Sequence, residues 1–136
     1  MNRHVLVAVV ALAVSAGAAG AQTRIDKAPI KSTPTTDAQK MFDTYCAVCH
    51  GKDGTGNGPA AKALVKVPAD LSRISARNNG TFPDVRVRRY IEGLDEVPAH
   101  GTRDMPMWGE LFKSLNRSTA QIRIAVLSDY LKSLQK

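Results

Sequence analysis

Two cysteines and a histidine stand within five consecutive residues, in the order Cys46-Ala47-Val48-Cys49-His50. Each of the two thiols can add to one vinyl group of a porphyrin, and the two thioethers place the following imidazole beside the iron. This pentapeptide is the pattern of covalent c-type haem attachment. We therefore predict one haem c, tethered by Cys46 and Cys49, with His50 as an iron ligand.

The same two cysteines could instead form a thioredoxin-like redox pair, a structural disulfide or half of a zinc site. A redox pair opens a helix directly after a strand, whereas the residues before Cys46 have helical periodicity. A structural zinc site needs about four ligands. The chain has no third cysteine, and His100 is its only other histidine outside the first 21 residues. The sequence therefore favours haem attachment.

The candidates for the second iron ligand are Met105, Met107 and His100. A methionine thioether stabilises ferrous iron relative to a second imidazole and leaves no coordination position open to a substrate. Methionines near a tryptophan are usually core residues. Here Met105-Pro106-Met107-Trp108-Gly109 is predicted to be a loop, since it is rich in glycine and proline, and this favours ligation by a methionine.

Four glycines follow the cysteine motif, at positions 51, 54, 56 and 58. They do not indicate a phosphate-binding loop, because no strand precedes them and neither of the common glycine-rich phosphate patterns is present. We predict instead that these glycines allow tight backbone turns beside the haem.

Helical periodicity begins at Asp37, which can cap the helix, as can Thr36. The apolar face of this helix carries Ala38, Met41, Phe42, Tyr45 and Cys49, spaced as one stripe of an α-helix. The helix therefore presents the first cysteine near its end, with Phe42 and Tyr45 on the buried side.

A second long helix is predicted at the C-terminus, where Ser118 and Gln121 form a capping box. Its expected apolar residues are Ile122, Val126, Tyr130, Leu131 and Leu134, and its expected polar face carries Arg123, Lys132 and Gln135. Two amphipathic helices at opposite ends of a small chain are expected to pack together. Phe42 and Tyr130 are the predicted contact.

Shorter helices are expected around Pro59–Val65 and over Asp84–Glu92, the second ending at Gly93. No strand pattern is present. The predicted fold is therefore all-α, with the two terminal helices packed together and short helices and loops wrapped around one haem.

Residues 1–21 are typical of a secretory signal peptide. Arg3 supplies the positive charge, Val5 to Val14 are uninterrupted apolar residues, and Ala19-Gly20-Ala21 predicts cleavage before Gln22. An uncleaved membrane anchor is the alternative, although the apolar run is short for a spanning helix. We expect a signal peptide at 1–21, a flexible leader at 22–36 and one domain at 37–136, located in the periplasm and not inserted in the membrane after cleavage. A domain this small buries little surface by itself, so the protein without haem should be poorly folded.

Over residues 37–134 the chain resembles the class I c-type cytochromes, particularly the bacterial periplasmic proteins with a single haem. The resemblance rests on motifs that occur in this order: Cys46-Ala47-Val48-Cys49-His50-Gly51, Gly54-x-Gly56-x-Gly58-Pro59, Pro68-Ala69-Asp70-Leu71, Tyr90-Ile91-x-Gly93 and Met105-Pro106-x-Trp108-Gly109. The haem motif is highly specific, and the others are weak singly.

This resemblance implies Met105 as the second axial ligand, with Met107 as the alternative. It also implies that a proline carbonyl accepts a hydrogen bond from the other ring nitrogen of His50. Pro68 is the better match for this carbonyl and Pro59 is possible. Trp108 is expected to cover the haem or to bind a propionate, with ordinary packing as the alternative.

The chain carries a net charge of +7. Arginines give its middle part a positive bias, at positions Arg73, Arg77, Arg86, Arg88, Arg89 and Arg103. A basic ring around a haem edge would steer the protein to an acidic redox partner, whereas a merely solvated face is the alternative. Export and the absence of a binding motif argue against nucleic acid.

The sequence thus predicts a periplasmic carrier of single electrons between a respiratory or dehydrogenase donor and an acceptor such as a terminal oxidase. No set of catalytic residues is recognisable. Two alternatives remain: the cytochrome subunit of a larger oxidoreductase, or a haem enzyme or gas-binding protein with an open sixth position. The protein is expected to be a monomer or a subunit of such a complex.

Overall fold

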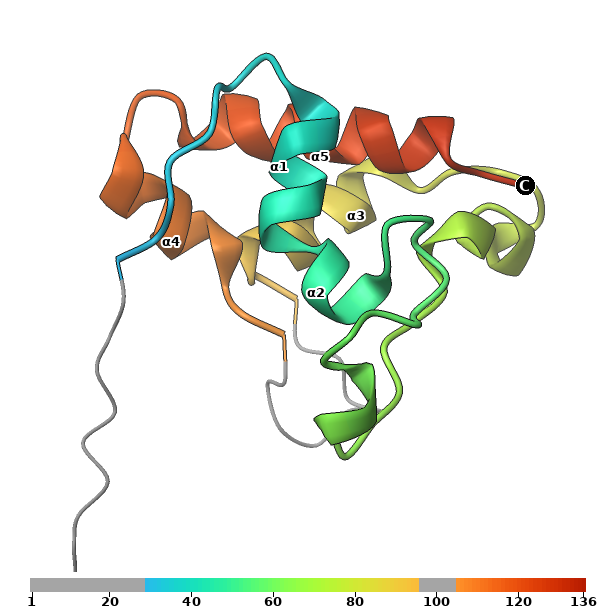
Figure 1. The fold of residues 1–136 in the computed structure, drawn as a ribbon. Coiled ribbons are helices and arrows are strands. Elements are labelled where there is room, and N and C mark those ends of the chain that lie inside the picture. Colours follow the sequence, from blue (N-terminus) through green and yellow to red (C-terminus); the bar gives the residue numbers. More distant parts are fainter. Residues whose placement is uncertain (1–28, 96–104) are drawn as a thin grey trace, which may run out of the picture.

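The computed structural model describes residues 29–95 and 105–136, and within these ranges it contains helices and no strands (Figure 1). The α-helices are α1 (Ala38–Tyr45), α2 (Ala47–His50), α3 (Asp84–Glu92), α4 (Trp108–Leu115) and α5 (Ala120–Ser133). Three 3-10 turns lie between α2 and α3, at Ala61–Ala63, Leu71–Arg73 and Ala76–Asn78. The predicted all-α fold is confirmed.

Helix α1 begins where the sequence predicted. The Asp37 side chain accepts a hydrogen bond from the backbone N–H of Lys40 at 2.8 Å and so caps the first turn. Met41, Phe42 and Tyr45 are buried. The helix ends at Cys46, whose N–H still donates to the carbonyl of Phe42, and α2 starts with the next residue.

The terminal helices pack together as expected, and Figure 1 shows α1 crossing α5. The Phe42 and Tyr130 rings lie 5.3 Å apart between centroids, which confirms the predicted contact. Helix α5 also contacts α3 and α4, so it is the element around which the other helices gather. The most deeply buried large side chains include Phe42, Phe112 and Ile124.

The predicted faces of α5 are partly wrong. Ile122 is 52% exposed, whereas Arg123, assigned to the polar face, is only 4% exposed. The buried residues of this helix are Ala120, Arg123, Ile124, Leu127, Ser128 and Leu131. Because α1, α3 and α4 all contact α5, its buried surface is wider than one apolar stripe and includes polar side chains.

The predicted capping box is also absent. The Ser118 hydroxyl donates to the side-chain oxygen of Asn116, and the Gln121 amide donates to the carboxylate of Glu92 in α3. Thr119 is the N-cap residue of α5 and makes no side-chain capping bond. Both side chains of the expected box therefore have other partners.

Helix α3 has its predicted bounds and ends at Gly93, which has a left-handed φ of 86°. The helix expected around Pro59–Val65 is reduced to the turn at Ala61–Ala63. Helix α4 was not predicted. This helix begins directly after the segment Met105 to Met107. The glycine and proline residues of that region predicted a loop, so the apolar residues that follow were not recognised as a helix.

The boundaries of the signal peptide, leader and domain remain predictions, since residues 1–28 lie outside the described ranges, as do His100 and Arg103. Within the expected leader, however, Thr33 is only 4% exposed and contacts α1 and α5. Contacts of the folded domain thus begin before Asp37. No helix in residues 29–95 and 105–136 is long and apolar enough to cross a membrane.

Candidate functional site

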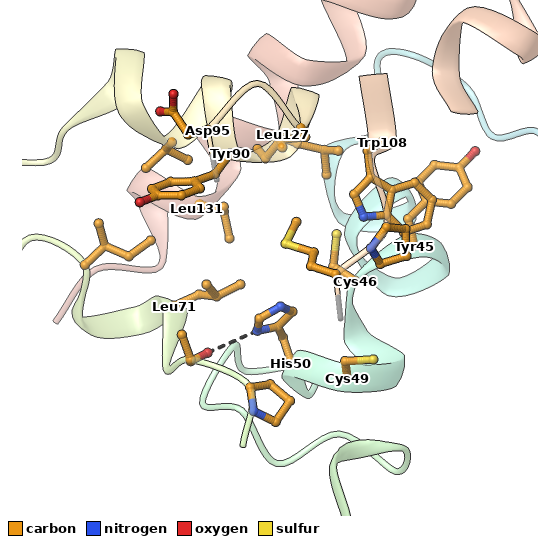
Figure 2. A pocket seen from close by; sticks show the side chains of 18 of the residues that line it. Tyr45, Cys46, Cys49, His50, Leu71, Tyr90, Asp95, Trp108, Leu127 and Leu131 are labelled. Carbon is orange, nitrogen blue, oxygen red and sulfur yellow. Dashed lines mark hydrogen bonds between the residues drawn. The ribbon is translucent and has the colours of Figure 1, made fainter. Parts of the chain in front are cut away.

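A cavity of about 670 Å³ opens between the helices and the 3-10 turns, and Figure 2 shows it from close by. Its volume lies within the range of small-molecule and cofactor sites. All the predicted site residues line it: Cys46, Cys49, His50 and Met105, together with Met107. Apolar side chains make up much of the remaining wall, including Phe42, Leu71, Ile74, Val87, Ile91, Leu127 and Leu131.

The two cysteines are positioned by one helical turn. The N–H groups of Cys49 and His50 both donate to the carbonyl of Cys46, at 3.1 and 2.9 Å. Neither cysteine forms a disulfide, and both side chains are partly buried. Burial, with a smaller contribution from the neighbouring Cys49, raises the pKa of the Cys46 thiol to about 12, so this thiol is neutral at physiological pH.

His50 is oriented by a hydrogen bond between its Nδ1 and the carbonyl oxygen of Ala69, 3.0 Å away and drawn as a dashed line in Figure 2. A carbonyl only accepts, so Nδ1 carries the proton and donates, and the lone pair of Nε2 is left for a metal. Burial lowers the pKa of His50, and the bond to Ala69 partly offsets this effect. A neutral imidazole with a free Nε2 is the form that binds iron.

The partner of His50 corrects the prediction, which favoured the Pro68 carbonyl over that of Pro59. The Pro68 carbonyl instead faces Gly56, where an added β-carbon would clash with its oxygen. With Pro68 turned to Gly56, it is the carbonyl of Ala69, one residue later, that reaches the imidazole.

The glycine-rich segment holds residues 68–71 beneath His50. Gly51, Gly54 and Gly56 all have φ values between 74° and 87°, which side-chain-bearing residues rarely adopt. The Gly56 N–H donates to the carbonyl of His50, and the Leu71 N–H donates to that of Gly54. The predicted tight turns are therefore present, and they connect the two sides of the cavity floor.

Met105 and Met107 both line the cavity and have similar exposed fractions, 41% and 40%. They differ in their surroundings: a β-carbon added to Gly93 would lie 2.8 Å from Cβ and Cγ of Met107. The stem of Met107 therefore packs directly on the end of α3.

Trp108 belongs to an aromatic wall on one side of the cavity. Its ring centroid lies 5.2 Å from that of Tyr45 and 5.6 Å from that of Phe112. Tyr45 and Trp108 both line the cavity. The packing role considered for Trp108 is therefore present, and it places an indole at the cavity surface.

The arginines predicted to form a basic ring do not all line the cavity. Arg77 and Arg86 line the cavity, where Arg77 donates to the Asp70 carbonyl and Arg86 lies over the Tyr90 ring. Arg88 instead forms salt bridges with Asp84 and Asp129, and Arg89 forms one with Asp95. The positive charge at the cavity thus comes from a subset of the arginines, with Lys66.

The residues present fit a haem. Two thiols and a neutral imidazole share one cavity with apolar walls, which suits a flat, largely apolar group that carries a metal at its centre. Within the described residues, no group of three or more histidine, cysteine, aspartate or glutamate side chains could hold a metal ion directly.

A family model described as cytochrome c matches residues 35–135. The chain belongs to the cytochrome c family. Neither the curated proteins nor the solved structures contained a significant match to it. The small all-helical fold of this cytochrome agrees with class I. Membership implies a covalently bound haem c and electron transfer by its iron, and family members are typically exported and are usually electron carriers.

Sequence reasoning missed three contributors to this site. The backbone carbonyl of Ala69 accepts the hydrogen bond that orients His50, and a backbone contact of this kind leaves no pattern of side chains in the sequence. Helix α4 positions Trp108 and Phe112, and the apolar spacing of Leu111, Phe112 and Leu115 could have indicated it. Thr33 was assigned to the leader although it bonds to the cavity-lining Tyr45.

Proposed function

We propose that this cytochrome is a periplasmic carrier of single electrons with one haem c, bound through Cys46 and Cys49 and ligated by His50 and Met105. The observation that carries the proposal is that these four side chains line one cavity. Haem iron held there supplies a one-electron couple between its ferric and ferrous states. The chain itself provides the tethers, the ligands, an apolar shell and a charged rim.

His50 supports this assignment through its geometry. The bond to Ala69 fixes both the tautomer and the orientation of the ring, so Nε2 is available without rearrangement. The covalent tethers lie on the same helical turn. Ligand and tethers are thus positioned by a single local element.

Met105 is favoured over Met107 as the second ligand. The Met107 stem is packed against Gly93, and Met107 is the N-cap residue of α4, so the movement of its sulfur is restricted, whereas Met105 lies three residues before the start of this helix. Ligation by a thioether would close the sixth position and favour the ferrous state. The site then acts in electron transfer without a catalytic residue.

The partner is proposed to be a redox protein with an acidic docking surface. Arg77, Arg86 and Lys66 line the cavity, and net positive charge near it would speed encounters with a negative surface. We propose that the protein neither binds nucleic acid nor inserts into a membrane. We also propose that it is a monomer or a subunit of a larger complex.

The first test is the absorption spectrum of the purified protein in both oxidation states, with Met105→Ala and Met107→Ala as matched variants. Ferric iron bound to methionine sulfur gives a weak charge-transfer band in the far red. We expect this band in the native protein and in Met107→Ala, and its loss in Met105→Ala.

Loss of the band in Met107→Ala alone would assign the ligand to Met107. High-spin iron in the native protein would contradict the carrier proposal and indicate an open sixth position, as in a ligand-binding haem protein.

A further inference from the structure

Arg123 of α5 is a buried cation. Its exposed fraction is 4%, and its guanidinium donates from Nη2 to the carbonyl of Thr33 at 2.7 Å and from Nη1 to the Thr33 hydroxyl at 3.1 Å. It forms no salt bridge within the described part of the chain. An arginine keeps its charge at any physiological pH, so the charge is held in place by neutral acceptors.

The surroundings of this charge are apolar. Its Nη1 also lies 3.6 Å from the Met41 sulfur, and its Cζ lies 6.0 Å from the centre of the Phe112 ring. Met41 and Phe112 are fully buried. The Arg123 Nε is buried without a hydrogen-bond partner among the described residues. Water and salt therefore screen this charge much less than a surface charge.

One aromatic layer separates Arg123 from the haem cavity. The Phe112 ring, which faces the guanidinium, lies 5.2 Å from Tyr45 and 5.6 Å from Trp108 between centroids. Tyr45 and Trp108 line the cavity. The charge thus lies behind the aromatic wall.

A chain of hydrogen bonds follows the same path. Tyr45 donates its hydroxyl proton to the carbonyl of Lys31 at 2.9 Å, so the Thr33 hydroxyl donates to Tyr45 at 3.0 Å and accepts from Arg123. In Figure 2 the Tyr45 hydroxyl points away from the cavity. The donors all run in one direction, so the bonds polarise one another.

We propose that Arg123 raises the reduction potential of the haem iron through its buried charge, which residues 31–33 hold behind Tyr45 and Phe112. Oxidation adds a positive charge to the iron, and a fixed cation in a weakly screened environment makes that addition less favourable. The proposal rests on the proposed function, because it places the haem in the cavity.

The test compares midpoint potentials of the haem-loaded protein, measured by spectroelectrochemical titration. Arg123→Gln removes the buried charge, and Arg117→Gln removes an exposed arginine from the turn before α5. We expect Arg123→Gln to shift the equilibrium toward the ferric state about tenfold, or about 59 mV for one electron, and Arg117→Gln to shift it less than twofold. The Arg123→Gln shift should persist at high salt, where surface effects are screened.

Two further variants separate charge from packing. Arg123→Lys keeps the charge, and Thr33→Val keeps it but removes a hydroxyl from the chain of bonds. Both variants are expected to be less stable than the native protein. Their equilibrium between ferric and ferrous haem should stay within about twofold of the native value. If Arg123→Gln does not fold, Arg123→Met removes the same charge with an apolar side chain of similar length and carries the same expectation.

The proposal would be overturned if Arg123→Gln or Arg123→Met shifted the midpoint potential no more than Arg117→Gln does. It would also be overturned if Arg123→Lys or Thr33→Val shifted the potential as much as Arg123→Gln does. Failure of the proposed function can be told apart from failure of this proposal, because the native protein would then lack the absorption spectrum of iron bound to methionine. If only this proposal fails, the native protein has that spectrum, and the midpoint potentials of the variants alone differ from those expected.

Discussion

At the scale of single residues, the cavity depends on backbone atoms as much as on side chains. Nδ1 of His50 bonds to the carbonyl of Ala69, and the N–H of Gly56 bonds to the carbonyl of His50. The Pro68 carbonyl lies so close to Gly56 that no side chain fits between them. A small backbone displacement at Gly56 would therefore reach His50, the proposed iron ligand.

A matched pair of glycine variants tests this dependence. Gly56 and Gly80 have similar left-handed φ values, 87° and 80°, but only Gly56 is crowded, since a β-carbon on Gly80 would meet nothing within 4 Å. Gly80→Ala should cost about 1–2 kcal/mol of unfolding free energy from backbone strain. Gly56→Ala should cost about 1–3 kcal/mol more through overpacking and should alter the haem spectrum. Chemical unfolding of both variants measures the difference, and equal losses would show that the close approach to Pro68 is unimportant.

At the scale of elements, α5 holds the other helices by polar contacts as well as apolar ones. The Ser128 hydroxyl, fully buried, donates to the carboxylate of Asp84 in α3 at 2.7 Å. This bond, with a smaller contribution from Arg88, lowers the pKa of Asp84 below its ordinary value. The ionised carboxylate thus stabilises the α3–α5 contact.

The stability of this contact should depend on pH. Because the pKa of Asp84 is lower in the folded than in the unfolded protein, its contribution is complete above the unfolded value and is lost as the pH falls through the folded value. Ser128→Ala should lower the unfolding free energy at pH 7 by about 1 kcal/mol, a modest value because water reaches part of the Asp84 side chain.

The difference between wild type and Ser128→Ala should then narrow as the pH is lowered below about 4. Ser133→Ala is the control, since the exposed Ser133 hydroxyl donates to an uncharged carbonyl on the same helix. Its effect should not change with pH. A Ser128→Ala difference that stays constant between pH 7 and pH 3 would contradict a role for the Asp84 charge.

At the scale of the whole molecule, the helices pack on α5 and together enclose one side of the cavity. Residues of all five α-helices line it, together with residues from the segment 64–78 and from the loop before α4. Their apolar side chains need the cofactor to complete the buried interior, because a chain of this size buries little surface by itself.

Preventing haem attachment should therefore prevent folding. The double variant Cys46→Ser and Cys49→Ser removes both tethers, and we expect it to lose most of its far-ultraviolet helical signal and its cooperative thermal transition. The loaded wild-type protein is the reference for circular dichroism and thermal unfolding. A native-like helical signal with a cooperative transition in the haem-free variant would show that the helices form the core without the cofactor.

Features that depend on neighbouring residues could be predicted from the sequence alone. The cysteine motif forms one turn, Asp37 caps α1, and α3 ends at Gly93, because capping, periodicity and glycine conformation act over a few residues. The order of the motifs also sufficed to indicate the family, which the match over residues 35–135 confirms.

Contacts between residues far apart in the chain, by contrast, became known only from the three-dimensional fold. Arg123 looks like a surface residue in its helix, yet Thr33, ninety residues earlier, makes its burial possible by supplying two acceptors. The carbonyl of Ala69 rather than Pro68 reaches His50 because Gly56 occupies the other side. Periodicity reports which side chains are apolar, whereas burial of a charge or choice of a carbonyl depends on the complementary atoms that the fold brings to it.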